Sequence, residues 1–426
     1  MTAVTAGRPR RRFGRNELAD LLVRHRSTSI LVGMSLFGVL LYFLPFVPPF
    51  SLFNFHQAWL NSFASAGIFV LLALGLNVVV GLAGLLDLGY AAFFAFGAYT
   101  YAYGASPFSG NHFPFLLMLF LGAVVAALWG LLLGAPTLRL RGDYLAIMTL
   151  GFGEIVPIVF LNTDTYTRGT NGIGGIFRPD LPILGRFGAL DNFKYFVVMV
   201  FIITLTMILL YRLQDSRIGR AWMAIREDEL AAAASGINTV TTKLLAFSIG
   251  ATTAGFAGVF SASKLTIVSP DQFLFAVSFT VLAMVVLGGM GNIWGVAVGA
   301  FIIALIQSTF LTQLNQFVTV FRGVPVLDIV SRVNFTQYQF LIYGIALVLM
   351  MLFRPEGLFP SQRRRMELRI AEELDPEAEA KALEAAAAAE TVTGGGGPTD
   401  PGVIGSMGPP PGSDEATGQS PGDDRP

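Results

Sequence analysis

The sequence predicts an all-α protein whose helices form a bundle that crosses a membrane about ten times. Hydrophobic residues make up 54% of the 426 residues and charged residues only 13%, whereas soluble domains usually carry about 25% charged residues. Residues 27–138 contain a single formally charged side chain, that of Asp87, and residues 272–321 contain none. A helix needs about 20 apolar residues to cross a bilayer, so each of these tracts can hold several spans.

Ten apolar stretches are candidates for these spans, and the count has a range of about eight to eleven. The third and the eighth are short or interrupted by glycine, which makes them the least typical of a full span. In chain order the stretches are residues 28–46, 58–80, 88–104, 113–134, 143–161, 194–211, 244–263, 275–290, 293–314 and 336–353.

Basic residues near the ends of the spans predict which ends face the cytoplasm. Arginines gather in residues 8–26, 139–141, 212–226 and 354–365, so these segments and both termini are predicted to be cytoplasmic. An even number of spans agrees with this orientation. The loop of residues 162–193 also carries arginines although it falls outside, but it is long and contains aspartates.

Composition divides the chain into four parts. Residues 1–27 form a basic arm, and residues 28–360 form the transmembrane domain. Residues 361–390 are rich in Ala, Glu and Arg and are compatible with a surface helix. Residues 391–426 are rich in Gly, Pro, Ser and Asp and are predicted to be disordered, because they cannot bury enough apolar area to offset the entropy of ordering.

The residues that usually carry catalysis or bind metals are sparse. Cysteine is absent, and the three histidines are far apart in the sequence. None of the lysines closes a phosphate-binding loop, which requires a glycine-rich turn followed by Lys and by Ser or Thr. We therefore expect no enzyme activity, cofactor or metal, and the net charge of zero gives no indication of a nucleic-acid partner. If ATP drives transport, the motor is another subunit.

Two glycine-rich segments resemble each other faintly. Residues 79–89 read VVGLAGLLDLG, and residues 285–291 read VVLGGMG. Both lie where two predicted spans meet. Transporter folds often contain repeats whose helices are broken at glycines beside the substrate, but glycine-rich helix contacts also recur by chance in any bundle.

The loop of residues 215–237, DSRIGRAWMAIREDELAAAASGI, is predicted to contain a short amphipathic helix on the cytoplasmic side. Arginines and apolar residues recur at helical spacing, and a glycine suits the helix end. Such a helix can sit in a groove on a cytoplasmic partner, or it can lie on lipid headgroups as an ordinary interfacial helix. The residues assigned to partner contact are Arg217, Arg220, Trp222, Ile225, Arg226, Asp228, Glu229, Ala231, Ala232 and Gly236.

The same loop resembles the coupling loop of ABC-transporter permeases, in which two alanines, three residues and a glycine follow an acidic residue. Ala231, Ala232 and Gly236 match that spacing. The acidic position is occupied by Leu230, with Glu229 one place earlier, so the match is partial.

Five motifs in chain order carry a more specific resemblance. They are GLNVVVGLAGLLDLGYAAFFAFGAYTYAY at 75–103, RLRGDYLAIMTLGFGEI at 139–155, TNGIGGI at 170–176, VVLGGMGNIWGVAVGA at 285–300 and FRPEGLF at 353–359. Together with the loop of residues 215–237, they resemble the branched-chain amino acid ABC permease family, and within it the larger of the two permease subunits. The N-terminal arm and the residues after Pro360 lie outside the resemblance.

This resemblance implies a multi-subunit importer in the inner (plasma) membrane. Its expected partners are a second, related permease subunit, two cytoplasmic ATP-binding subunits, an extracytoplasmic substrate-binding protein and the lipid bilayer. The expected task is the uptake of branched-chain amino acids. Relatives that take up urea or short amides remain an alternative that the residues do not separate.

Polar residues and glycines near the predicted span junctions are the candidates for the substrate path. Glu154 lies within the fifth span, where a buried carboxylate can bind one end of a zwitterion or brace the helix. Asp87 is expected at the inner surface, where a carboxylate costs little. Each polar candidate also fits a packing role, such as an interhelical hydrogen bond. The candidate set is Asn77, Gly81, Gly84, Thr149, Glu154, Gly288, Gly289 and Gly291.

A glycine-rich turn in the loop of residues 162–193 is the candidate for contact with the binding protein. A plain hairpin turn explains the same residues equally well. The turn contains Asn171, Gly172, Gly174 and Gly175.

These features predict a gate without chemistry of its own, in which ATPases pull the helix at residues 220–236 and the attached spans tilt as rigid bodies. An ion-coupled secondary transporter is one rival, and it would need an intramembrane acid such as Glu154 to titrate. An intramembrane enzyme is another, and it would need a convergent set of acids or of His and Glu. The apolar segments show no such set.

Overall fold

The computed structural model describes residues 26–43, 56–137, 143–182, 184–311, 337–354 and 357–359. The chain divides into one unit of residues 1–366 and another of residues 367–426. The predicted tail at 391–426, the predicted surface helix at 361–390 and most of the predicted basic arm lie outside the described residues.

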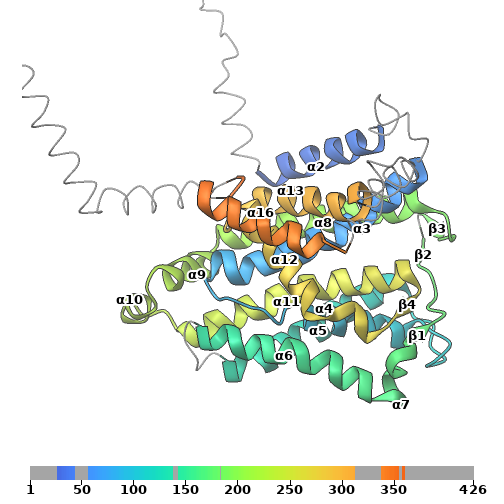
Figure 1. The fold of residues 1–426 in the computed structure, drawn as a ribbon, viewed down its shortest axis with the longest axis horizontal. Helices are drawn as coiled ribbons and strands as arrows, with labels where there is room; N and C mark the ends of the chain where they lie inside the picture. The colour runs from blue at the N-terminus through green and yellow to red at the C-terminus, as the bar shows by residue number, and fades with distance from the viewer. Residues whose placement is uncertain are drawn as a thin grey trace, which may run out of the picture. The chain divides into compact units, whose positions relative to one another are not determined.

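The first unit is a bundle of helices (Figure 1), and each main helix overlaps one predicted span. Within the part of the chain that the structure describes, six helices are long and apolar enough to cross a membrane, and three others are shorter apolar helices. The fold is therefore a membrane helical bundle, and the count of about ten spans and the cytoplasmic termini remain predictions. The helices are α2 (Arg26–Phe43), α3 (His56–Leu76), α4 (Ala91–Gly104), α5 (Phe115–Thr137), α6 (Asp143–Asn162), α8 (Asn192–Gln214), α11 (Thr239–Leu265), α12 (Phe275–Gly288), α13 (Ile293–Leu305) and α16 (Gln339–Phe353).

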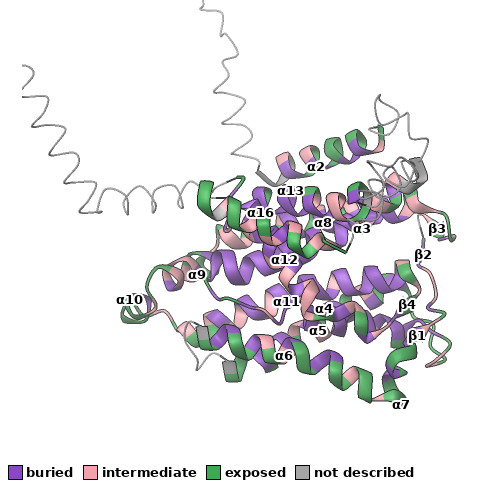
Figure 2. Ribbon diagram, viewed as in Figure 1, coloured by how far each residue is buried: buried purple, intermediate pink, exposed green. Residues whose placement is uncertain are grey.

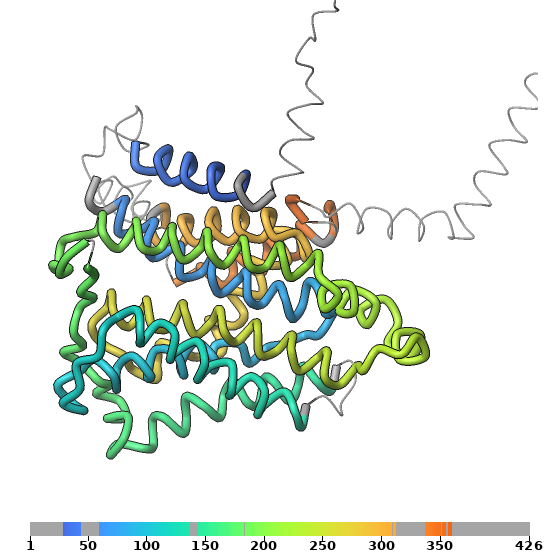
Figure 3. The backbone as a smooth tube through the Cα atoms, turned by 180° about the vertical axis from the view of Figure 1, so that it is seen from behind, coloured from blue at the N-terminus to red at the C-terminus, as the bar shows by residue number. Residues whose placement is uncertain are grey.

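Short elements occupy the two ends of the bundle. One end carries α7 (Asp164–Thr167), η4 (Gly169–Asn171), η5 (Pro270–Phe273) and four two-residue strands. The strands are β1 (Ile173–Gly174), β2 (Asp180–Leu181), β3 (Gly185–Arg186) and β4 (Ile267–Val268), and they form the antiparallel pairs β1–β4 and β2–β3. The opposite end carries α9 (Arg217–Glu227) and α10 (Glu229–Ala234) (Figure 1). Figure 3 shows from behind that α8 leads into α9 and α10, and that α11 returns from them into the bundle.

The centre of the bundle is formed by helices that are buried on nearly all sides. Nearly every residue of α4 is buried, and α11 is buried along most of its length, whereas α2, α6 and α16 lie at the edges with exposed residues (Figure 2). Small residues let α4 and α11 approach closely, because a Cβ placed on Gly97 would lie 2.5 Å from the carbonyl oxygen of Gly255.

Two of the membrane helices continue as a π-helix. α3 passes into η3 (Asn77–Leu82), and α13 passes into η6 (Ile306–Phe310). After η3 the chain is non-helical until α4 begins at Ala91, so the third predicted span starts later than expected and has only 14 residues. A π-helix often marks a functional site, and η3 lies where the first glycine-rich segment begins.

Candidate functional site

The loop of residues 215–237 folds as two short helices, where we expected one. Ser216 begins α9 by accepting a hydrogen bond from the backbone N–H of Gly219 at 3.3 Å. Asp228 has an extended backbone, and its Oδ1 accepts hydrogen bonds from the N–H groups of Leu230 and Ala231 at 2.7 and 3.0 Å. Asp228 therefore ends α9 and caps α10, which is why the helix is not continuous.

The anchor of α9 is Trp222, whose side chain has 0% exposure. Its Nε1–H donates a hydrogen bond of 2.7 Å to the carbonyl oxygen of Thr242, in the first turn of α11. Ile225 is buried one turn further along the same face. A buried indole that finds a polar partner holds its helix in one position, so α9 is fixed to the start of α11.

α10 is tied to α11 by an ion pair. The Nζ of Lys243 lies 2.6 Å from the Oε1 of Glu229, and the lysine side chain is 6% exposed. Ala232 packs inward, whereas Ala231 and Leu230 are exposed, the latter by 67%. Gly236 follows α10 with a positive φ of 85°, as expected for a helix end. α10 is thus held against α11 by the ion pair, and its outer face is apolar.

Arg226 joins α9 to the first glycine-rich segment. Its Nη1 donates a hydrogen bond of 2.5 Å to the carbonyl oxygen of Gly81 in η3. Gly84 has a positive φ of 71°, and a Cβ placed on it would lie 2.7 Å from the Cγ of Arg226. The glycine therefore provides both the backbone turn and the space for the arginine side chain.

The two similar glycine-rich segments, residues 79–89 and 285–291, lie against each other. The Oδ1 of Asn77 accepts a hydrogen bond of 2.9 Å from the backbone N–H of Gly291. A Cβ placed on Gly81 would lie 2.6 Å from the nitrogen of Gly291, so the two backbones touch. Gly289 and Gly291 have positive φ values of 107° and 84°. We call this contact of Asn77, Gly81 and Gly291, together with Arg226, the glycine junction.

Gly288 serves a different contact from the glycine junction. A Cβ placed on it would lie 2.7 Å from the carbonyl oxygen of Gly295, so it allows α12 and α13 to pack closely. The candidate glycines of the two segments lie near one another, because the segments meet at Gly81 and Gly291. That the two segments are a repeat stays a prediction.

Asp87 is buried, with 1% exposure, which corrects the expectation that it lies at the surface. Its Oδ1 accepts a hydrogen bond of 2.9 Å from the N–H of Gly89, whereas its Oδ2 is buried and has no hydrogen-bond partner among the described residues. The segment that carries it is held by α6, because the hydroxyl of Thr149 accepts a hydrogen bond of 3.0 Å from the N–H of Leu88. Asp87 is not among the path residues predicted from the sequence, although its isolation as the one charged residue within residues 27–138 is a signal for function.

A small cavity adjoins the Asp87 side chain. The cavity is lined by Asp87, Gly89, Phe93, Leu133, Thr149, Phe152 and Phe247. Thr149, a predicted path residue, thus lies beside a buried acid and three aromatic rings, and Asn77 lies apart from it in the glycine junction.

Glu154 does not join either group. The sequence left open whether Glu154 is a buried carboxylate or a helix-packing or interfacial residue, and the structure places it on the exposed side of α6. Its neighbour Gly153 is buried on the other side of the helix, where an added Cβ would lie 2.7 Å from the Cα of Gly89. Successive residues of a helix point in different directions. Gly153 therefore faces Gly89, whereas the next residue, Glu154, lies on the exposed face.

The candidate turn for the binding protein is pinned to the bundle. Ile173 pairs with Val268 and Gly174 with Ile267 in the β1–β4 ladder. Gly172 is buried with a positive φ of 65°, whereas Asn171 and Gly175 are exposed. The turn lies at the end of the bundle opposite α9 and α10 (Figure 1), and its contact with a binding protein stays a prediction.

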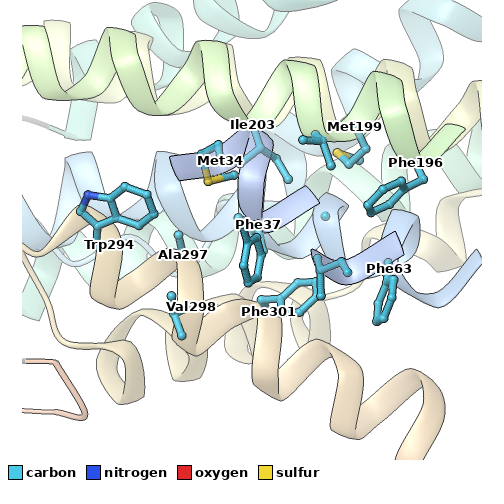
Figure 4. A pocket seen from close by; sticks show the side chains of 14 residues that line it. Met34, Phe37, Phe63, Phe196, Met199, Ile203, Trp294, Ala297, Val298 and Phe301 are labelled. Carbon is cyan, nitrogen blue, oxygen red and sulfur yellow. The ribbon is translucent and has the colours of Figure 1, made fainter. Parts of the chain in front are cut away.

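A pocket between α2, α3, α8 and α13 is lined by apolar side chains alone (Figure 4). Met34, Phe37, Phe63, Met199 and Phe301 surround it. No ionisable residue lines it, so it offers nothing to hold the charged ends of an amino acid. Among the described residues, no group of three or more His, Cys, Asp or Glu side chains could hold a metal.

Comparison with known proteins gives one family. The family model described as a branched-chain amino acid transport system permease component matches residues 58–351. The chain is 42% identical over 325 residues to the high-affinity branched-chain amino acid transport system permease protein LivM of Escherichia coli (strain K12). The aligned region covers 71% of this chain and 70% of LivM. No solved structure gives a significant match.

Two more distant relatives are permease proteins of two different import systems. The permease protein LivH of the same Escherichia coli strain is 25% identical over 321 residues, which covers 71% of this chain and 95% of LivH. The autoinducer 2 import system permease protein LsrC of Enterobacter sp. (strain 638) is 28% identical over 339 residues, which covers 76% of this chain and 92% of LsrC.

Proposed function

Because this chain belongs to the branched-chain amino acid transport permease family, we propose that it is the membrane subunit of an ATP-driven importer of branched-chain amino acids. In this proposal the chain forms part of the translocation path, and separate cytoplasmic ATPase subunits move it. A second permease subunit completes the path, and an extracytoplasmic binding protein delivers the substrate. The bundle lies in the inner (plasma) membrane with α9 and α10 on the cytoplasmic side.

The observation that carries this proposal is the contact of Arg226 with the glycine junction. α9 and α10 extend from one end of the bundle and expose an apolar face beside arginines, which suits a groove on a cytoplasmic ATPase. The arginine on α9 reaches the carbonyl oxygen of Gly81, where the two glycine-rich segments meet. A displacement of α9 therefore acts directly on the place where the membrane helices are broken.

The bracing of α9 and α10 supports movement as one body. Trp222 binds the backbone of Thr242, and Lys243 binds Glu229, so both short helices are fixed to the start of α11. α11 packs along α4 and α5 in the centre of the bundle. Motion of the short helices thus tilts α11 together with them, which is the rigid-body type of change expected of a gate.

The path in this proposal is apolar with a few polar groups, as a branched side chain with charged ends requires. Thr149 and Asn77 remain the candidate polar groups within the bundle, and Glu154 is the candidate on its exposed face. A urea or short-amide importer is the alternative within the same family, and the relative named for autoinducer 2 import supports the view that solutes vary among relatives.

An ion-coupled secondary transporter is the second candidate, and buried Asp87 favours it. Its carboxyl group has one oxygen without a hydrogen-bond partner among the described residues. Carboxyl groups at such positions carry protons or ions in many transporters. This candidate predicts solute accumulation without any ATPase.

Reconstitution tests these alternatives. The chain is placed in proteoliposomes with the second permease, the ATPases and the binding protein encoded with it, and uptake of labelled leucine and urea is measured with and without ATP. The proposal expects leucine uptake only in the complete complex with ATP. Accumulation by the chain alone contradicts it and supports ion coupling, whereas uptake of urea but not leucine reassigns the solute. Alanine at Asn77, Thr149 and Glu154 together should reduce uptake, and unchanged uptake removes these residues from the path.

A further inference from the structure

One face of α6 is exposed along the length of the helix. Figure 2 shows exposed residues along α6 at the edge of the bundle. Their helical spacing in the sequence places them in one stripe on the helix. The opposite face packs inward, with Thr149 and Gly153 against Leu88 and Gly89. The exposed apolar members of the stripe include Tyr144, Ile147, Met148, Ile155, Ile158 and Val159.

Glu154 lies in the middle of this stripe. It is the twelfth of the 20 residues of α6, and at 1.5 Å per residue the helix is about 30 Å long, the thickness of the apolar part of a bilayer. The carboxyl group is therefore about halfway through the membrane, where an ionisable side chain in contact with lipid is costly. Such residues face other protein or water in membrane proteins, so lipid does not cover this stripe.

The exposed faces of two other long helices, the adjoining α5 and the more distant α8, are different. α5 exposes Phe120, Leu128 and Leu132, and α8 exposes Phe201 and Leu205, with no charged side chain among them. Among the six described helices that are long enough to cross a membrane, Glu154 is the sole ionisable residue more than four positions from an end. The faces of α5 and α8 suit lipid, and the face of α6 does not.

We propose that this face of α6 is covered by the second permease subunit, with Glu154 in the seam between the two. This inference rests on the proposed function, which requires such a subunit. Gly151 lies in the stripe one turn before Glu154, and a Cβ placed on it would meet nothing within 4 Å, so a partner helix can approach closely there.

A different subunit fits this face better than a second copy of the same chain. In a symmetric pair, each α6 would meet the α6 of its partner at the same depth in the membrane. Glu154 would then face Glu154, and two carboxylates in close contact disfavour each other. A related but different chain can instead supply a donor opposite the carboxyl group.

The absence of cysteine allows a direct test, because each introduced cysteine is unique. Met148→Cys and Ile155→Cys place it on the α6 face, whereas Leu128→Cys on α5 and Leu205→Cys on α8 are matched controls with exposures between 44% and 58%. Each full-length variant is co-expressed with the LivH-like permease from its own genome and the ATPases, labelled with benzophenone maleimide and irradiated in proteoliposomes. The two permeases carry different affinity tags.

The inference expects severalfold more cross-linked product carrying both tags from Met148→Cys and Ile155→Cys than from the two controls. Equal yields at all four positions, product containing two copies of this chain, or label on α6 that reacts with lipid alone would each overturn it. Leucine uptake by the same preparations is measured separately. ATP-driven uptake without α6 cross-links rejects this interface and leaves the proposed function standing, whereas α6 cross-links without uptake reject the function and keep the interface.

Discussion

The side chain of Asn77 accepts a hydrogen bond from the backbone N–H of Gly291, which lies 214 residues further along the chain. This bond fastens the end of α3, where it turns into a π-helix, to the turn between α12 and α13. The asparagine is 1% exposed, so water does not compete for the bond. This hydrogen bond holds the two segments of the glycine junction together, and Arg226 of α9 donates a second hydrogen bond there, to the carbonyl oxygen of Gly81.

Asn77→Ala removes the acceptor and leaves the N–H of Gly291 buried and unpaired. We expect a loss of about 1–3 kcal/mol in the stability of the bundle, because an unsatisfied buried amide keeps its full desolvation cost. Thermal unfolding of the purified protein, followed by fluorescence size-exclusion chromatography, measures the loss. Asn162→Ala is the control, since that side chain is exposed and donates to the carbonyl oxygen of Ile158 in its own helix. Equal melting temperatures for the two variants would contradict the role of the bond.

Gly81→Ala tests the close contact of the two segments. The added Cβ would lie 2.0 Å from the Oδ1 of Asn77 and 2.6 Å from the nitrogen of Gly291, so backbone must move. We expect a destabilisation of about 1–3 kcal/mol or more, as is typical of overpacking. Gly344→Ala in α16 is the matched control, because nothing lies within 4 Å of its added Cβ. The yield of folded monodisperse protein in detergent should fall for the first variant and stay unchanged for the second.

The sequence predicts the helices better than it predicts their faces. Long apolar tracts place a helix at each predicted span, but the tract of residues 143–161 is apolar nearly all round, so no periodicity indicates that Glu154 is exposed. Likewise, composition alone does not show that the segment around Asp87 is packed beneath α6, because that burial depends on a hydrogen bond to Thr149, which is 61 residues away from Leu88.

Rules that use only neighbouring residues were sufficient for a feature such as a helix end, which depends on those neighbours alone. Gly236 at the end of α10 was predicted from its position after an alanine run, and its positive φ agrees. The break at Asp228 follows from another local rule, since an acidic residue directly before a helical run is a good cap, but the continuous helical spacing of the loop concealed it. The meeting of the two glycine-rich segments required the tertiary structure, because the sequence suggested only their similarity.

Arg226→Ala should separate ATP hydrolysis from transport. The side chain forms a charge-assisted hydrogen bond to Gly81, and losing a bond worth about 1.5–3 kcal/mol makes the coupled arrangement roughly ten- to hundredfold less populated. We expect leucine uptake to fall while the complex assembles and hydrolyses ATP. Arg217→Ala, which removes an exposed charge from the same helix, is the control. Uptake that falls equally in both variants would indicate loss of partner binding and not of transmission.

Trp222→Phe should loosen α9 without emptying its pocket. The phenyl ring keeps most of the buried apolar contact, but the carbonyl oxygen of Thr242 loses its donor, at a cost of about 1–3 kcal/mol. Trp222→Ala adds a cavity and should cost about 3–5 kcal/mol. Pull-down of the ATPase by the detergent-solubilised permease measures the effect, and we expect partial retention for the first variant and little for the second. Full binding by Trp222→Ala would mean that the ATPase does not require the position of α9.

Asp87→Asn separates a structural role of this residue from a role of its charge. The amide oxygen can still accept the hydrogen bond from the N–H of Gly89, and a buried amide costs less than a buried carboxylate. We therefore expect equal or greater thermal stability and unchanged ATP-driven leucine uptake. Asp87→Ala removes the acceptor as well, so it should lose about 1–3 kcal/mol of stability and lower uptake through misplacement of the segment under α6. If Asp87→Asn folds normally but abolishes uptake, the carboxyl group takes part in transport itself, and ion coupling becomes the better reading of the buried acid.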